Sequence, residues 1–124
     1  MGRPFWEQAG VASKIDVRIG PAIESLDAIL ADESTHGTFD FGYVDADKEN
    51  YPGYCDRILT LLKPNGFLIV DNTIWKGKVA DPQWRENDEN TKLIVKCVQD
   101  LIANDALEVC TLMLADGVTI ARKK

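Results

Sequence analysis

Two short polar clusters carry most of the side chains that could do chemistry in this sequence. The first contains Asp45, Asp47 and Lys48, and the second contains Asp71 and Asn72. Two carboxylates and one amide oxygen make a hard, all-oxygen donor set, which suits Mg²⁺ or another divalent cation and offers nothing soft for zinc. Beside such a cation the ammonium of Lys48 would be disfavoured and its pKa lowered, so this lysine is a candidate general base.

Both clusters also have a purely structural interpretation. Asp and Asn are common where strands end, because they cap helices and form turns. A lysine three positions after Asp45 is ordinarily a solvated surface residue. The two interpretations differ in geometry, since ligands of open α/β sheets bind at the carboxyl ends of strands. If the two strands that precede the clusters are neighbours, the polar side chains converge.

Apolar runs bounded by turn residues alternate along the chain with patterns of period near 3.6. This alternation predicts an α/β fold in which helices cover a parallel sheet. The expected strands are residues 15–19, 39–44, 67–70, 107–114 and 118–121, and the expected helices are residues 23–31, 51–62 and one that starts after a cap at Asp88 or Asn90. The two polar clusters directly follow strands 39–44 and 67–70.

The connections between these elements differ in character. Residues 63–66, Lys-Pro-Asn-Gly, are a strong turn signal. Residues 73–90 lack periodicity and are long for a plain connection, so they are expected to be a loop that covers a site. The last helix is expected to bury Leu93, Ile94, Cys97, Val98, Leu101 and Ile102.

Composition restricts the classes of partner. The chain has 124 residues, enough for one domain spanning residues 1–124, and its net charge of −6 from 20 acidic and 14 basic residues disfavours nucleic acid. No apolar run approaches the roughly 20 residues that cross a bilayer. Cys55, Cys97 and Cys110 lack metal-ligand spacing and suit a reducing compartment. We therefore expect a cytoplasmic protein that binds neither membrane nor nucleic acid.

Longer motifs around the two clusters resemble the caffeoyl-CoA/catechol type of class I S-adenosylmethionine-dependent O-methyltransferases. The segments that carry the resemblance are FDFGYVDADKENY at residues 39–51 and GFLIVDNTIW at residues 66–75, and similarity extends from WEQAGV at residues 6–11 to DGVT at residues 116–119. The resemblance implies a Rossmann-like methyltransferase fold, truncated at the N-terminus, with a mostly parallel sheet and a C-terminal antiparallel pair.

The resemblance also implies roles for individual residues. It implies metal ligation by Asp45, Asp71 and Asn72, a general base at Lys48, cofactor contacts from Ala22, Asp45 and Asp47, and substrate contacts from Trp75 and Lys76. The implied cofactors are S-adenosylmethionine and Mg²⁺ or another divalent cation, and the implied substrate is a small catechol-like or hydroxylated aromatic molecule. Plant members have asparagine where this chain has Lys76, so an acceptor other than caffeoyl-CoA is expected.

Members of that family begin with a glycine-rich, cofactor-binding segment that is absent from this sequence. We therefore expect strand 15–19 to lack a neighbour and apolar surface to be exposed. Self-association into a homo-oligomer, strand exchange or a rearranged N-terminal portion should follow, with little or no activity for the chain by itself.

Two alternatives remain open at this point. Phosphatases and phosphotransferases of the haloacid-dehalogenase type also place Asp-x-Asp after an apolar strand. In that family the motif follows the first strand, and its second Asp is followed by Thr or Val, where this chain has Lys48. The other alternative is a catalytically inactive methyltransferase module that serves in structure or assembly.

Overall fold

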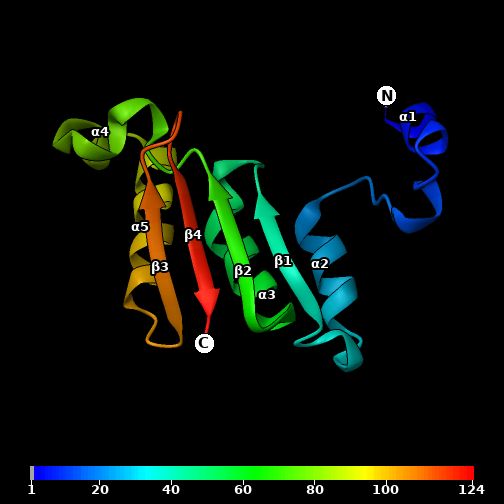
Figure 1. Cartoon of the computed structure of the whole chain (residues 1–124). Coiled ribbons are helices and arrows are strands. Elements are labelled where there is room, and N and C mark those ends of the chain that lie inside the picture. Colours follow the sequence, from blue (N-terminus) through cyan, green and yellow to red (C-terminus); the bar gives the residue numbers. More distant parts are fainter. Residues whose placement is uncertain (1) are drawn as a thin grey trace.

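A four-stranded mixed sheet forms the centre of the computed structural model, which describes residues 2–124 (Figure 1). The strands are β1 (Phe39–Val44), β2 (Leu62–Asp71), β3 (Leu107–Leu112) and β4 (Val118–Lys123), and their spatial order is β1-β2-β4-β3. β1 and β2 are parallel, whereas β4 is antiparallel to both β2 and β3. The α/β class and the C-terminal antiparallel pair are confirmed, but the expectation of a mostly parallel sheet is wrong.

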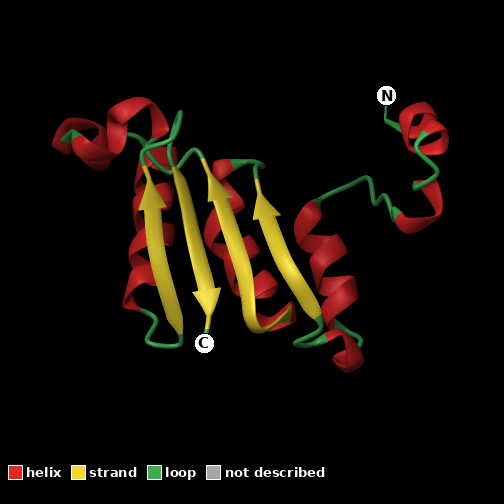
Figure 2. Cartoon of the chain, viewed as in Figure 1, coloured by secondary structure: helices red, strands yellow, loops and turns green. Residues whose placement is uncertain are grey.

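The helices are more numerous than the periodicity predicts. They are α1 (Arg3–Gln8), α2 (Ala22–Leu30), α3 (Tyr51–Leu61), α4 (Pro82–Asn87) and α5 (Glu89–Ala103), with short 3₁₀ turns η1 (Ala12–Lys14), η2 (Glu33–Thr35), η3 (Lys48–Asn50) and η4 (Trp75–Ala80). In the common view of Figures 1 and 2, α3 and α5 lie behind the sheet, α2 lies beyond β1, and α1 is separated from the sheet. Within residues 2–124, none of the helices is long and apolar enough to span a bilayer.

The core lies between the sheet and the two helices behind it. Alternate residues of β2, among them Leu68 and Val70, are fully buried and meet the inward sides of α3 and α5. The carboxylate of Asp88 caps α5 by accepting a hydrogen bond from the Thr91 backbone N–H at 2.9 Å. Ile102 was expected to be buried but is 64% exposed, because it lies next to the buried Leu101 and points about 100° away around the helix.

The expected strand at residues 15–19 is absent. Its apolar residues Ile15, Val17 and Ile19 alternate as a strand requires, but all three are exposed. A β-strand needs a hydrogen-bonded neighbour, and within residues 2–124 none is paired with this segment. Without this strand the only parallel pairing in the described sheet is β1 with β2, which explains why the sheet is not mostly parallel.

Two connections also differ from expectation. Residues 73–90 are not a structureless loop, because they contain η4 and α4 and the first residues of α5. The predicted turn at residues 63–66 lies inside β2, where the register moves from Phe39 opposite Leu62 to Phe41 opposite Phe67. The extra residues of β2 are therefore looped out of the pairing, and Asn65 has a positive φ of 65°.

On β1 and β2, the face of the sheet that points away from α3 and α5 carries exposed aromatic side chains. Phe39, Phe41 and Tyr43 of β1 and Phe67 of β2 are 41–63% exposed on this side. We call these four residues the open face. Within residues 2–124 no helix covers it in the view of Figure 2.

Candidate functional site

The two polar clusters meet at one end of the parallel strand pair. Val44 of β1 is the register partner of Val70 of β2. Asp45 and Asp71 each follow one of these paired residues. Because parallel strands present their carboxyl ends at the same edge, both carboxylates extend from that edge, followed in the chain by Lys48 and Asn72.

Lys48 is the centre of this cluster. Its side chain is only 9% exposed, and its ammonium donates a hydrogen bond to Oδ1 of Asn72 at 2.8 Å and lies 3.9 Å from Oδ1 of Asp45. It also donates to the hydroxyl of Tyr51 and lies 5.5 Å from the centre of the Trp75 ring. Burial lowers the pKa of Lys48, although the nearby carboxylates act in the opposite direction.

The backbone conformation of the second strand end is unusual. Asn72 has a positive φ of 57°, which few residues other than glycine adopt. Its backbone N–H donates to Oδ1 of Asp71 at 2.6 Å, and the hydroxyl of Tyr43 donates to the other oxygen of that carboxylate. This hydrogen bond raises the pKa of Tyr43. The Asp71 carboxylate is thus held in one orientation by two donors, and each of its oxygens keeps a free lone pair.

The donor set fits a hard divalent cation. Among residues 2–124, no group of three or more His, Cys, Asp or Glu side chains could hold a metal ion, so a site here depends on two carboxylates and the Asn72 amide. Oxygens of Asp45 and Asn72 already lie near a positive charge, the Lys48 ammonium. Oxygen-only ligands with room for water or substrate oxygens are typical of Mg²⁺ sites.

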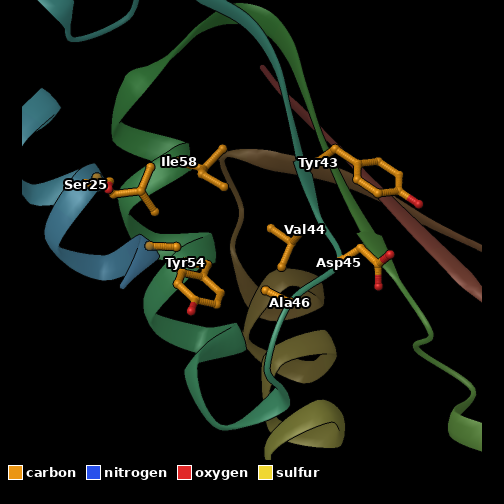
Figure 3. A pocket seen from close by; sticks show the side chains of 9 residues that line it. Ser25, Tyr43, Val44, Asp45, Ala46, Tyr54 and Ile58 are labelled. Atoms are coloured by element: carbon orange, nitrogen blue, oxygen red, sulfur yellow. The ribbon is translucent and has the colours of Figure 1, made fainter. Parts of the chain in front are cut away.

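A cavity of about 300 Å³ lies beside the end of β1 (Figure 3). Ser25 of α2 and Tyr54 and Ile58 of α3 face the strand end there. A second cavity of about 510 Å³ shares Ala22, Ala46 and Tyr54 with the first. The three predicted cofactor contacts, Ala22, Asp45 and Asp47, all line one or both of these cavities.

Asp47 has a polar environment of its own within the larger cavity. The hydroxyl of Tyr54 donates to its carboxylate at 2.6 Å, and the side chain of Asn50 donates to its other oxygen. The Tyr54 bond lowers the pKa of Asp47. Burial, and then the same bond, raises the pKa of Tyr54 to about 12. Asp47 is therefore ionised and Tyr54 protonated at neutral pH.

The two predicted substrate contacts lie in different environments. Trp75 is half-buried and its ring faces the Lys48 ammonium, whereas Lys76 is exposed and its backbone N–H donates to Asp116. Both residues have positive φ angles, 49° and 57°. Trp84, the other tryptophan of this segment, lies over the Lys78 ammonium at 3.9 Å from the ring centre. Of Trp75, Lys76 and Trp84, only Trp75 places its ring near the Lys48 ammonium.

Sequence reasoning missed the tyrosines that surround the cluster. Tyr51 was assigned only to the start of a helix, yet it is fully buried and accepts a hydrogen bond from Lys48. Its spacing of three residues from Lys48 was the available signal, because residues three apart on one helical turn share a face. Tyr43 carried no comparable signal, since its bond to Asp71 joins residues on different strands.

Comparison with known proteins gives a consistent family assignment. A family model described as O-methyltransferase matches residues 1–124. Caffeoyl-CoA O-methyltransferase 1 of Zea mays is 42% identical over 131 aligned positions, which cover 99% of this chain and 49% of the relative. Tricin synthase 1 of Oryza sativa subsp. japonica is 42% identical over 130 positions, which cover 99% of this chain and 52% of the relative. The chain spans about half the length of the curated relatives that it matches.

Solved structures share the fold. An O-methyltransferase from Bacillus cereus in complex with SAH superposes with a TM-score of 0.85 at 29% identity, covering 98% of this chain and 56% of that chain. The O-methyltransferase TomG from Streptomyces achromogenes, in complex with SAM, gives a TM-score of 0.86 at 25% identity and covers 98% of this chain and 55% of that chain. The Rossmann-like methyltransferase architecture of the described residues is therefore confirmed.

Proposed function

This chain belongs to the O-methyltransferase family, and from that premise we propose that the protein transfers a methyl group from S-adenosylmethionine to a hydroxyl oxygen of a catechol-like or other hydroxylated aromatic acceptor. One observation carries the proposal: at the ends of two parallel strands, oxygens of Asp45 and Asn72 lie near the buried ammonium of Lys48, and Asp45 lines a cavity there. The donor would occupy the cavities lined by Ala22, Asp45 and Asp47.

The metal proposal rests on the same side chains. Asp45, Asp71 and Asn72 would hold Mg²⁺ or another divalent cation, and when bound this cation supplies stabilisation of a phenolate-like oxygen. Tyr43 and the Asn72 backbone N–H hold the Asp71 carboxylate in place, so the orientation of this one proposed ligand is set before a metal ion arrives.

Lys48 is the proposed general base. Burial lowers its pKa, which makes the neutral amine more accessible than in a solvated lysine. In the proposed reaction the acceptor hydroxyl gives its proton to Nζ of Lys48, the acceptor oxygen forms the new O–CH₃ bond, and the S–CH₃ bond of the donor breaks. Trp75, whose ring faces Nζ, and the exposed Lys76 would contact the acceptor.

Titration calorimetry and a methyl-transfer assay test this proposal. The donor proposal predicts saturable binding of S-adenosylmethionine in the presence of Mg²⁺, tested at protein concentrations that detect a Kd of about 1 mM. The acceptor proposal predicts methyl transfer to a catechol, at a low rate for this chain by itself because it spans about half the length of its relatives. Asp71→Asn should abolish the metal-dependent rate. Asp40→Asn is the matched control, because Asp40 is an exposed carboxylate at the opposite end of β1 that pairs with Lys63. Failure to bind the donor would overturn the donor proposal for this chain, and activity that survives both chelation and Asp71→Asn would overturn the metal proposal.

The open face favours self-association as a further proposal. Its four aromatic residues form an exposed apolar patch on β1 and β2, which a second copy of the chain would cover. Sedimentation equilibrium should then give a mass above that of the monomer, reduced by Phe41→Lys. Ile102→Lys is the control, because Ile102 is similarly exposed, 64% against 63%, but lies on α5. A monomer at all concentrations, or equal effects of the two substitutions, would contradict the proposal.

A further inference from the structure

Two cysteines that are far apart in the sequence are in contact behind the sheet. Cys55 lies on α3 and Cys97 on α5, 42 residues apart, and their sulfur atoms are 3.3 Å from each other. Both residues are almost fully buried, at 3% and 2% exposure. Cys110 on β3 is exposed. The chain therefore has one preassembled thiol pair and one separate, accessible thiol.

The thiol pair borders a small cavity. About 40 Å³ of space lies between α3 and α5, lined by both cysteines together with Pro52, Asp56, Leu59 and Asp100. A single water needs about 10–15 Å³, so this cavity has room for a molecule of the size of hydrogen peroxide. The contact with Cys97, and then burial, raises the pKa of the Cys55 thiol. The thiolate is therefore scarce at neutral pH, which makes the pair slow to react.

We propose that Cys55 and Cys97 are a redox-modification site that forms a reversible disulfide between α3 and α5 when the protein meets hydrogen peroxide. One sulfur attacks a peroxide oxygen and the O–O bond breaks, which gives a sulfenic acid and one water. The second thiol attacks the sulfenic sulfur, forms the S–S bond and releases a second water. Two thiols and one peroxide thus give one disulfide and two waters.

The short distance between the two sulfur atoms favours formation of the disulfide over further oxidation of either cysteine. A disulfide bond is about 2.05 Å long, so the two sulfur atoms must approach by a little over 1 Å from their present contact. A sulfenic acid on either cysteine has the other thiol as its nearest sulfur. Trapping as a disulfide should therefore precede oxidation to the sulfinic acid.

The bridge would join α3 and α5, two helices that follow segments of the polar cluster in the chain. Cys55 lies one helical turn after Tyr51, whose hydroxyl accepts a hydrogen bond from Lys48. α5 follows the segment that contains Trp75 after one intervening helix, α4. A covalent link between these helices restricts their separation, and it would do so without occupying the cavities beside β1.

The experiment uses hydrogen peroxide on the full chain, followed by mass spectrometry without reduction. The Cys110→Ser variant keeps only the buried pair, and Cys55→Ala in the same background is the matched control with a lone thiol. We expect the first to lose the mass of two hydrogens and to give a peptide linking Cys55 to Cys97, both reversed by dithiothreitol. Because the bridge closes a 42-residue separation, we expect the thermal midpoint to rise by roughly 10 °C.

Peptide mapping of the unaltered chain gives the same information without relying on any variant to fold. We expect a reagent for free thiols to label Cys110 at least about tenfold faster than either buried cysteine, and peroxide to link the buried pair. Because the buried pair is the slower to react, peroxide treatment is continued for at least about ten times the period that oxidises Cys110 fully. The proposal is overturned if both buried thiols are still free at that point, or if either reaches the sulfinic acid without a linked peptide.

Discussion

We expect Thr119→Val to lower the free energy of unfolding by about 1–3 kcal/mol. Thr119 is fully buried on β4, where its hydroxyl donates to Oγ1 of Thr73 at 2.9 Å and lies 2.9 Å from Oγ1 of Thr111. Valine has nearly the same shape, so the substitution leaves no large cavity. It does leave the hydroxyl of Thr73, which is only 5% exposed, without its donor.

The magnitude follows from the environment of each hydroxyl. The bond between Thr119 and Thr73 is worth about 1 kcal/mol, and leaving the buried Thr73 oxygen without a donor adds roughly 1–2 kcal/mol. Thr111 is exposed, so its hydroxyl can turn to water and adds little. Thr111→Val is therefore the matched control, since it removes one hydroxyl of the same hydrogen-bonded series and keeps the bond from Thr119 to Thr73. We expect this control to cost less than about 1 kcal/mol.

Urea unfolding followed by circular dichroism measures these differences, provided that the m-value is unchanged among the variants. The double variant Thr73→Val/Thr119→Val should be more stable than the sum of its single changes predicts, because removing both partners leaves no unpaired group. The reasoning is refuted if Thr119→Val is no more destabilised than Thr111→Val, or if the double variant shows simple additivity.

Three further predictions test other parts of the structure. Gly117→Ala should cost about 1–3 kcal/mol by thermal unfolding, because Gly117 has a φ of +84° and an added Cβ would lie 2.7 Å from the backbone nitrogen of Ile74. Leu68→Ala should cost about 2–5 kcal/mol at a fully buried position, whereas Phe67→Ala on the open face should cost clearly less. Lys48→Met should lower the methyl-transfer rate by at least about 100-fold in single-turnover assays while calorimetry shows donor binding unchanged; an unchanged rate would rule out Lys48 as the base.

Local pattern was sufficient for the elements that precede the site. Strand 39–44 was predicted with the bounds that β1 has, and helix 51–62 differs from α3 by one residue. Both rest on interactions within a few residues, namely side-chain periodicity and the polar residues that end each element. For the same reason the sequence indicated that Asp45 and Asp71 lie where strands end, and the longer motifs around them identified the family that the comparison then confirmed.

Long-range contact decided the rest, because no local pattern records which segments become neighbours. Residues 15–19 alternate like a strand, but alternation cannot supply the neighbouring strand that a ladder needs. The tertiary structure alone brings Asn72 to the Lys48 ammonium and Cys55 to Cys97, contacts between residues 24 and 42 positions apart. The sequence by itself thus determined which side chains were available at the strand ends. The pairing of β1 with β2 and the packing of α3 against α5 decided which of them meet.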